Sequence, residues 1–136
     1  MEKQLKIVID TNLWISFLIS KKFIKLENLL RKDELIIIMS QEQIDELFTV
    51  AKRDKFRKYF KFTDFLKLME EAFHYLEIIE VTSSYKLCVD SKDNFLLNLS
   101  VDGKADFLIS GDDDLLRLNK VQNTKIVKYS DFIKYL

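Results

Sequence analysis

Five short apolar runs alternate with stretches of helical periodicity along this chain, and this alternation limits the folds that the chain can adopt. The runs are Leu5–Ile9, Leu35–Met39, 77–81, 106–109 and 125–128. Each is rich in β-branched or aromatic residues and is bounded by polar residues, as expected of a buried strand. Strands that alternate with helices predict an α/β fold, with a mostly parallel central sheet of about five strands flanked by helices.

Helical patterns fill the segments between these runs. Ser40 begins a capping box, and the helix that it starts is expected to continue through Ala51. Thr63 is expected to cap the next helix, and Gly103 is expected to end the helix that contains residues 94–101. The apolar spacing after Thr63 predicts an inner helix face of Leu66, Met69, Phe73 and Leu76, with Phe65 and Ala72 beside it. The other predicted helices cover residues 12–20, 23–31, 115–118 and 131–136.

The chain has 136 residues, 48% of them apolar, which is enough to bury the core of one domain. We therefore expect a single domain over residues 1–136. The charged fraction is 32%, but eleven phenylalanines argue against disorder. No apolar run approaches the ~20 residues that span a bilayer, so no membrane association is expected. A lone cysteine, Cys88, cannot form an internal disulfide, and this favours a reducing, cytoplasmic location.

Acidic residues gather where the predicted strands end. Asp10 follows the first run directly, and Asp112 follows the fourth run after a serine and a glycine. Glu46 lies early in the helix after the second run, and Asp90 and Asp93 lie at the start of the helix that leads to the fourth run. In parallel α/β sheets these four segments reach the carboxyl edge, where ligands bind. The sequence therefore predicts one acidic site at this edge.

Carboxylates that lie this close repel one another and raise one another's pKa unless a cation neutralises them. A hard divalent cation such as Mg²⁺ takes oxygen ligands, whereas the chain has no cluster of histidine and cysteine for zinc. A metal held by carboxylates can activate a water and stabilise charge on a phosphodiester oxygen. This donor set favours metal-dependent hydrolysis of phosphodiesters.

A simpler interpretation exists for each acid taken alone. Asp10, Asp90, Asp93 and Asp113 stand where aspartates commonly cap helices, and a lone Glu46 on an exposed helix is ordinary surface. Independent caps do not explain why four separate segments bring acids to one edge. We therefore favour a shared site.

Four sequence blocks resemble the PIN domain family, specifically the members that are toxin components of toxin–antitoxin systems. The blocks are IVIDTN at 7–12, SQEQIDEL at 40–47, VDSKDNFLLNLS at 89–100 and ADFLISGDDDLL at 105–116. They occur in the family's order and spacing and span most of the chain. One departure is Ser91, where this subgroup usually has proline, and this substitution leaves the loop before Asp93 less rigid.

The resemblance assigns roles to individual acids. It implies that Asp10, Glu46, Asp93 and Asp112 are the catalytic residues and bind the metal. Supporting positions are Asn12 and Ser110, which stand where the family places polar residues beside the first acid, and the further acids Asp90 and Asp114. The resemblance also implies an endoribonuclease that uses Mg²⁺ or Mn²⁺, forms a homodimer and is neutralised by a small antitoxin protein.

Residues 52–67 are strongly basic, with seven basic residues against two acidic ones, and Phe56, Tyr59, Phe60 and Phe62 are interleaved with the basic residues. Basic groups beside aromatic stacking surfaces suit single-stranded RNA. The RNA-binding candidates are Lys52, Arg53, Lys55, Arg57, Lys58 and Lys61. Alternatively, this segment is a solvated helix whose aromatic residues enter the core, or its aromatic residues hold an antitoxin segment.

Two other functions stay open at this point. A phosphatase that uses Asp10 as nucleophile would need a second acid two residues later, where Asn12 stands. A non-catalytic RNA- or protein-binding module of the same fold would use its acids only as caps and surface. Trp14 and Phe17 follow Asp10 at helical spacing and are expected in the core or at a dimer interface.

Overall fold

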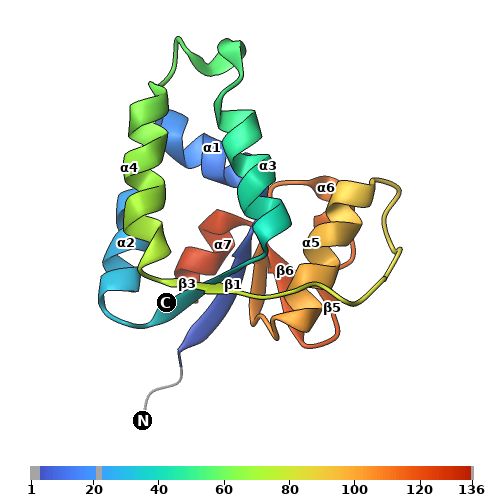
Figure 1. The fold of residues 1–136 in the computed structure, drawn as a ribbon. Coiled ribbons are helices and arrows are strands. Elements are labelled where there is room, and N and C mark those ends of the chain that lie inside the picture. Colours follow the sequence, from blue (N-terminus) through green and yellow to red (C-terminus); the bar gives the residue numbers. More distant parts are fainter. Residues whose placement is uncertain (1–3, 21–22, 136) are drawn as a thin grey trace.

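The computed structural model describes residues 4–20 and 23–135, and these residues form an α/β fold with one central sheet (Figure 1). Within these residues the sheet has six strands in the order β3-β2-β1-β4-β6-β5. All neighbouring strands are parallel except β5 and β6. The strands are β1 Leu5–Ile9, β2 Leu35–Met39, β3 Leu76–Ile78, β4 Phe107–Ile109, β5 Lys120–Val121 and β6 Thr124–Val127. The predicted fold class is confirmed.

The pleat of the central strands buries side chains on both faces of the sheet. Ile7 and Ile9 of β1 belong to one core cluster, whereas Val8 between them belongs to the other. Strand β2 alternates in the same way, with Ile37 and Met39 on the first face. Burial on both sides explains why these strands read as continuous apolar runs.

Helices cover both faces unequally (Figure 1). The larger core cluster contains side chains of α1, α2, α3, α4 and α7, and the smaller one contains side chains of α5 and α6. The helices are α1 Thr11–Ser20, α2 Phe23–Arg31, α3 Gln41–Ala51, α4 Phe62–Phe73, α5 Ser91–Asp102, α6 Asp113–Leu116 and α7 Tyr129–Lys134. Trp14 and Phe17 of α1 lie in the core, so they do not form a dimer interface. In the described part of the chain, no helix has the length and apolar character needed to cross a bilayer.

Helix α4 differs from its prediction in both start and orientation. Lys61 stands at the N-cap position, and its N–H donates to the Asp64 carboxylate at 3.0 Å, so Thr63 is not the cap. Phe65 and Ala72 are buried with Met69. Two residues of the predicted inner face are exposed, namely Leu66 at 42% and Phe73 at 47%. Apolar residues surround much of this helix, and the spacing therefore could not fix which side is buried.

Several element boundaries also differ from prediction. Strand β3 ends at Ile78, and the residues that follow it form an extended strap, residues 79–90, that leads to α5. Helix α5 begins three residues earlier than expected, and its C-cap is Gly103, as predicted. Helices α6 and α7 each begin two residues earlier. Strand β5 was not predicted because two residues show no periodicity, and the predicted end of the last helix, residue 136, lies outside the described residues.

Gly103 is required by packing. A Cβ atom there would lie 2.5 Å from Cγ2 of Ile38 and 3.1 Å from the carbonyl oxygen of Leu99. Ile38 is buried and β-branched, so it has little freedom to move away. A Cβ on Gly111, by contrast, would meet no atom within 4 Å.

We predict that Gly103→Ala lowers the free energy of unfolding by about 1–3 kcal/mol, because the added methyl overpacks this contact. Gly111→Ala is the matched control and should change stability little. Urea unfolding followed by circular dichroism measures both values. Equal stability of the two variants would contradict the packing argument.

Candidate active site

Four helices begin at the carboxyl edge of the sheet, and a side-chain oxygen caps each one. The carboxylates of Asp10, Asp90 and Asp112 accept hydrogen bonds from the backbone N–H groups of Asn12, Lys92 and Asp114, at 3.0, 2.8 and 2.9 Å. The Ser40 hydroxyl accepts one from Gln43 N–H at 3.2 Å, as the predicted capping box requires. The interpretation as helix caps is therefore correct for Asp10 and Asp90, whereas Asp112 caps α6 in place of Asp113, and Asp93 lies in the first turn of α5. Capping does not exclude the shared site, because a carboxylate has a second oxygen.

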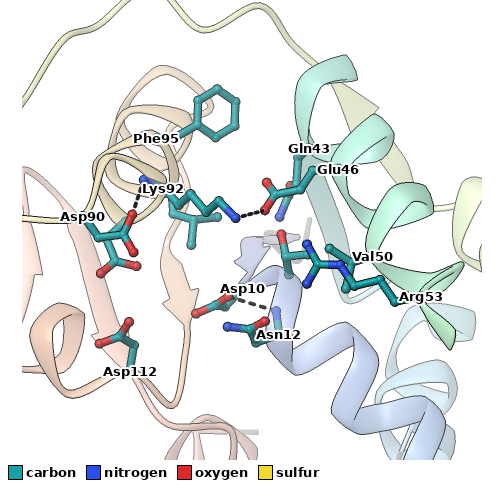
Figure 2. Close-up of a pocket in the computed structure, with 13 residues that line it drawn as sticks. Asp10, Asn12, Gln43, Glu46, Val50, Arg53, Asp90, Lys92, Phe95 and Asp112 are labelled. Atoms are coloured by element: carbon teal, nitrogen blue, oxygen red, sulfur yellow. Dashed lines mark hydrogen bonds and ion pairs between the residues drawn. The ribbon is translucent and has the colours of Figure 1, made fainter. Parts of the chain in front are cut away.

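The same edge holds a pocket in whose lining acidic side chains outnumber basic ones (Figure 2). All four acids that the sequence assigned to catalysis line it, together with one supporting acid. They are Asp10, Glu46, Asp93, Asp112 and Asp90. Two cations, Arg53 and Lys92, share the lining. The structure therefore brings the predicted acids of β1, α3, α5 and the β4–α6 turn around one cavity.

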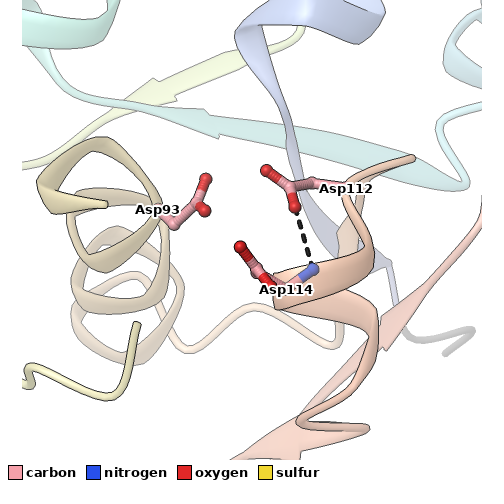
Figure 3. A group of neighbouring side chains, drawn as sticks. All are labelled: Asp93, Asp112 and Asp114. Atoms are coloured by element: carbon pink, nitrogen blue, oxygen red, sulfur yellow. Dashed lines mark hydrogen bonds between the residues drawn. The ribbon is translucent and has the colours of Figure 1, made fainter. Parts of the chain in front are cut away.

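Three aspartates form the tightest acidic group of the described residues (Figure 3). One carboxylate oxygen each of Asp93, Asp112 and Asp114 lies within 4.8 Å of the other two. Asp93 is only 6% exposed. Burial, and then the negative charges of Asp112 and Asp90, raise the pKa of Asp93 to about 6. This group therefore carries unfavourable charge at neutral pH.

Asp10 adjoins this group and is fixed by a serine. The Ser110 hydroxyl donates to Asp10 Oδ2 at 2.7 Å and accepts the backbone N–H of Asp112 at 3.0 Å. Burial raises the pKa of Asp10, while the hydrogen bonds from Ser110 and Asn12 oppose this shift. Asn12 contributes its backbone N–H to this interaction. Ser110 thus links the ends of β1 and β4 directly at the site.

Glu46 lies apart from the three aspartates. Its Oε1 lies 3.6 Å from Nζ of Lys92, in an ion pair between α3 and α5. Asp114, to which the sequence gave only a supporting position, lies inside the aspartate group instead. It also forms an ion pair with Arg117 one turn later, at 3.4 Å.

Gln43 is a pocket residue that the sequence analysis did not assign to the site. It is 1% exposed, and its Nε2 donates to the carbonyl oxygen of Ile9 at 2.8 Å. Its Oε1 is buried and has no hydrogen-bond partner among the described residues. The sequence signal that could have identified it is its position on the buried face of α3, beside Ile44 and Leu47, where a polar side chain is unusual.

A ladder of polar side chains on α5 holds the strap, and it was also not predicted. Asn94 accepts a hydrogen bond from the N–H of Cys88 and donates to its carbonyl oxygen, both at 2.8 Å. Asn98 binds Tyr85 in the same way at 2.7 and 3.3 Å. The Asp102 carboxylate accepts the N–H groups of residues 82 and 83. These three residues recur every four positions, so they lie on one face of α5.

Residues 52–61 of the basic segment lie outside the α-helices, whereas residues 62–67 form the start of α4. The segment contains a 3₁₀ turn at Asp54–Phe56, and its six RNA-binding candidates are all exposed. Phe60 is buried, and Phe56 and Phe62 pack against the larger core, while Tyr59 is 53% exposed. The structure therefore places most of these aromatic residues against the core. Of the six basic candidates, Arg53 lines the acidic pocket and the other five do not.

The acidic group fits a divalent cation. Its donors are carboxylate oxygens, which Mg²⁺ and similar hard cations prefer, and their mutual repulsion is what a cation would relieve. The unpartnered Oε1 of Gln43 supplies a further acceptor in the pocket for a water molecule.

Fold and pocket together define an α/β protein with a pocket of carboxylates at the carboxyl edge of its sheet. Residues 6–114 match the family model of the PIN domain, and the chain belongs to the PIN domain family. The uncharacterized protein MJ1680 of Methanocaldococcus jannaschii is 32% identical over 122 residues, which cover 87% of this chain and 78% of that protein. PIN domains are generally nucleases that act on RNA and use divalent metal ions.

A solved structure shares the fold at low sequence identity. The crystal structure of PAE2754 from Pyrobaculum aerophilum matches with a TM-score of 0.63 and 11% identity, covering 96% of this chain and 88% of that one.

We predict that Asp93→Asn raises the melting temperature of the metal-free protein at pH 7.5. The folded-state pKa of about 6 exceeds the ordinary value of 3.8, so the folded protein loses stability as the pH rises through this interval. At pH 5 Asp93 is mostly protonated, and the variant should gain little there. Mg²⁺ should stabilise the wild type at pH 7.5 more than it stabilises the variant.

Differential scanning fluorimetry at pH 5 and pH 7.5, each with EDTA or Mg²⁺, measures these melting temperatures. Asp113→Asn is the control, because Asp113 is exposed and lies outside both the pocket and the aspartate group. A lower melting temperature for Asp93→Asn than for the wild type in EDTA at pH 7.5 would show that Asp93 is not under electrostatic strain.

Proposed function

We propose that this protein is a metal-dependent endoribonuclease that hydrolyses RNA phosphodiester bonds, with Asp10, Glu46, Asp93 and Asp112 as its catalytic, metal-binding acids. One observation carries the proposal: acids from four separate segments line a single pocket at the carboxyl edge of the sheet. Membership in the PIN domain family supports the same reaction class.

The cation, Mg²⁺ or Mn²⁺, would be bound by Asp10, Glu46, Asp93 and Asp112 of the pocket lining, and also by Asp114, whose carboxylate lies beside those of Asp93 and Asp112. When bound, it would lower the pKa of a water molecule and neutralise charge on the phosphodiester oxygens. Asp114 thereby joins the proposed ligands on geometric grounds.

The chain's own side chains fix the geometry that this reaction needs. Ser110 and the Asn12 N–H hold both oxygens of the Asp10 carboxylate, so this group is oriented before any ligand arrives. Gln43, anchored to the carbonyl oxygen of Ile9, offers its Oε1 as an acceptor for a water molecule in the pocket. Substrate RNA would approach along the basic segment through Lys52, Arg53, Lys55, Arg57, Lys58 and Lys61.

A finer part of the proposal is that the protein is the toxin of a toxin–antitoxin pair and acts as a homodimer. It is supported by the resemblance of the four sequence blocks to such toxins. A short open reading frame adjoining the gene, whose product suppresses the nuclease when the two are co-expressed, would support the pairing. Analytical ultracentrifugation tests the dimer.

We predict that Asp10→Asn abolishes RNA cleavage and leaves the fold intact. Loss of even an outer-shell partner typically costs about 10–100-fold in metal affinity or activity, and loss of a ligand should cost more. Asparagine keeps an acceptor oxygen for the N–H of Asn12, so the helix cap survives. The assay follows mixed RNAs on denaturing gels with Mn²⁺, Mg²⁺ or EDTA.

Asp113→Asn again serves as the control and should cleave like the wild type. Cleavage by Asp10→Asn at the wild-type rate would refute the assigned site. Absence of Mg²⁺ and Mn²⁺ binding to the wild type in calorimetry at neutral pH would favour a non-catalytic binding module instead.

A further inference from the structure

Two cations extend into the acidic pocket from different elements (Figure 2). Lys92 lies in the first turn of α5, and Arg53 follows the end of α3. Five acids face these two cations in the pocket lining. An acidic lining of this kind repels RNA, so a nuclease site here needs positive groups that contact phosphate once the acids are neutralised.

Lys92 is held loosely in the structure. Its Nζ lies 3.6 Å from Glu46 Oε1, and the two side chains are 67% and 33% exposed. An ion pair this exposed is screened by solvent and adds little stability, so it exchanges readily. A positive ion in the pocket would compete with Lys92 for the Glu46 carboxylate and would repel the ammonium group.

Arg53 lines the pocket, whereas four neighbouring basic side chains lie over aromatic rings. Lys52 and Arg57 lie over the ring of Phe62, at 5.5 and 5.9 Å from its centroid. Lys55 and Lys58 lie over the rings of the residues that follow them, at 5.1 and 5.2 Å. No described residue forms an ion pair or a side-chain hydrogen bond with the Arg53 guanidinium, which faces the pocket.

We propose that Lys92 and Arg53 together bind a phosphate of the RNA, and that Lys92 transfers from Glu46 to this phosphate when divalent cations neutralise the pocket. This inference rests on the proposed nuclease function and names two substrate-binding residues for it. Metal and RNA binding are then coupled through Lys92: the metal releases the ammonium group, and the released group binds the substrate.

The test measures RNA and metal binding separately on Lys92→Gln and Arg53→Gln. Lys104→Gln is the charge-matched control, because Lys104 is exposed and follows the far end of the 12-residue helix α5, about 18 Å from its start. Anisotropy of a labelled single-stranded oligoribonucleotide, in Ca²⁺ at several salt concentrations, reports RNA affinity. Gels verify that the probe stays intact, and calorimetry with Mg²⁺ alone reports metal affinity.

We expect each pocket variant to weaken RNA binding about tenfold. Each should also reduce the slope of log affinity against log salt by about 0.7, the value for one lost phosphate contact on a single strand. Without RNA, Lys92→Gln should bind Mg²⁺ more tightly, by up to about fivefold, because the acids lose a competing cation. Lys104→Gln should change none of these values.

The proposed transfer of Lys92 predicts that Lys92→Gln strengthens Mg²⁺ binding and weakens RNA binding. Tighter Mg²⁺ binding with unchanged RNA affinity would mean that Lys92 is only a counter-ion of Glu46, and the inference would fail. Equal weakening by all three variants would indicate diffuse attraction and would also overturn it. RNA cleavage by the wild type tests the nuclease function separately. If the wild type cleaves RNA but the Lys92→Gln and Arg53→Gln variants bind RNA as the wild type does, only this inference is refuted.

Discussion

The two oxygens of the Asp10 carboxylate connect the fold to the site. One oxygen accepts the N–H of Asn12 and caps α1, while the other accepts the Ser110 hydroxyl at the end of β4, 100 residues away. Ser110 in turn accepts the N–H of Asp112. Because β1 and β4 are adjacent in the sheet, these hydrogen bonds hold the start of α1 and the start of α6 in a fixed relation. The arrangement of the acids depends on this link between neighbouring strands.

Polar side chains of α5 fix the strap by hydrogen bonds to its backbone, as Ser110 fixes the ends of β1 and β4. Asn94 pairs with both backbone groups of Cys88, two residues before Asp90, and Asp90 then caps α5 through Lys92 N–H. These bonds restrain the loop at which the PIN subgroup usually has proline and this chain has Ser91. Hydrogen bonding from the following helix restrains the backbone here without the fixed φ angle of proline. The expected loss of rigidity before Asp93 is therefore offset by the side chains of α5.

Sequence reasoning succeeded where burial leaves a strong pattern and failed where long-range contacts decide the outcome. Strands β1 and β2 were placed with the right bounds because both of their faces are buried. The common edge for the acids followed from parallel topology alone. The grouping of Asp93 with Asp114, and the pairing of Glu46 with Lys92, depend on how helices from separate segments approach each other. Local periodicity contains no information about such distances, and it also could not show which face of α4 is buried.

Both edges of the sheet are too short to recruit another chain. On one side the sheet ends in β3, with three residues, and on the other in β5, with two. A short edge offers few unpaired N–H and carbonyl groups, so it is a poor template for strand addition between molecules. Exposed apolar side chains lie instead on other surfaces, among them Leu66 and Phe73 on α4. The same short edges protect the chain from edge-to-edge aggregation while its parallel sheet forms.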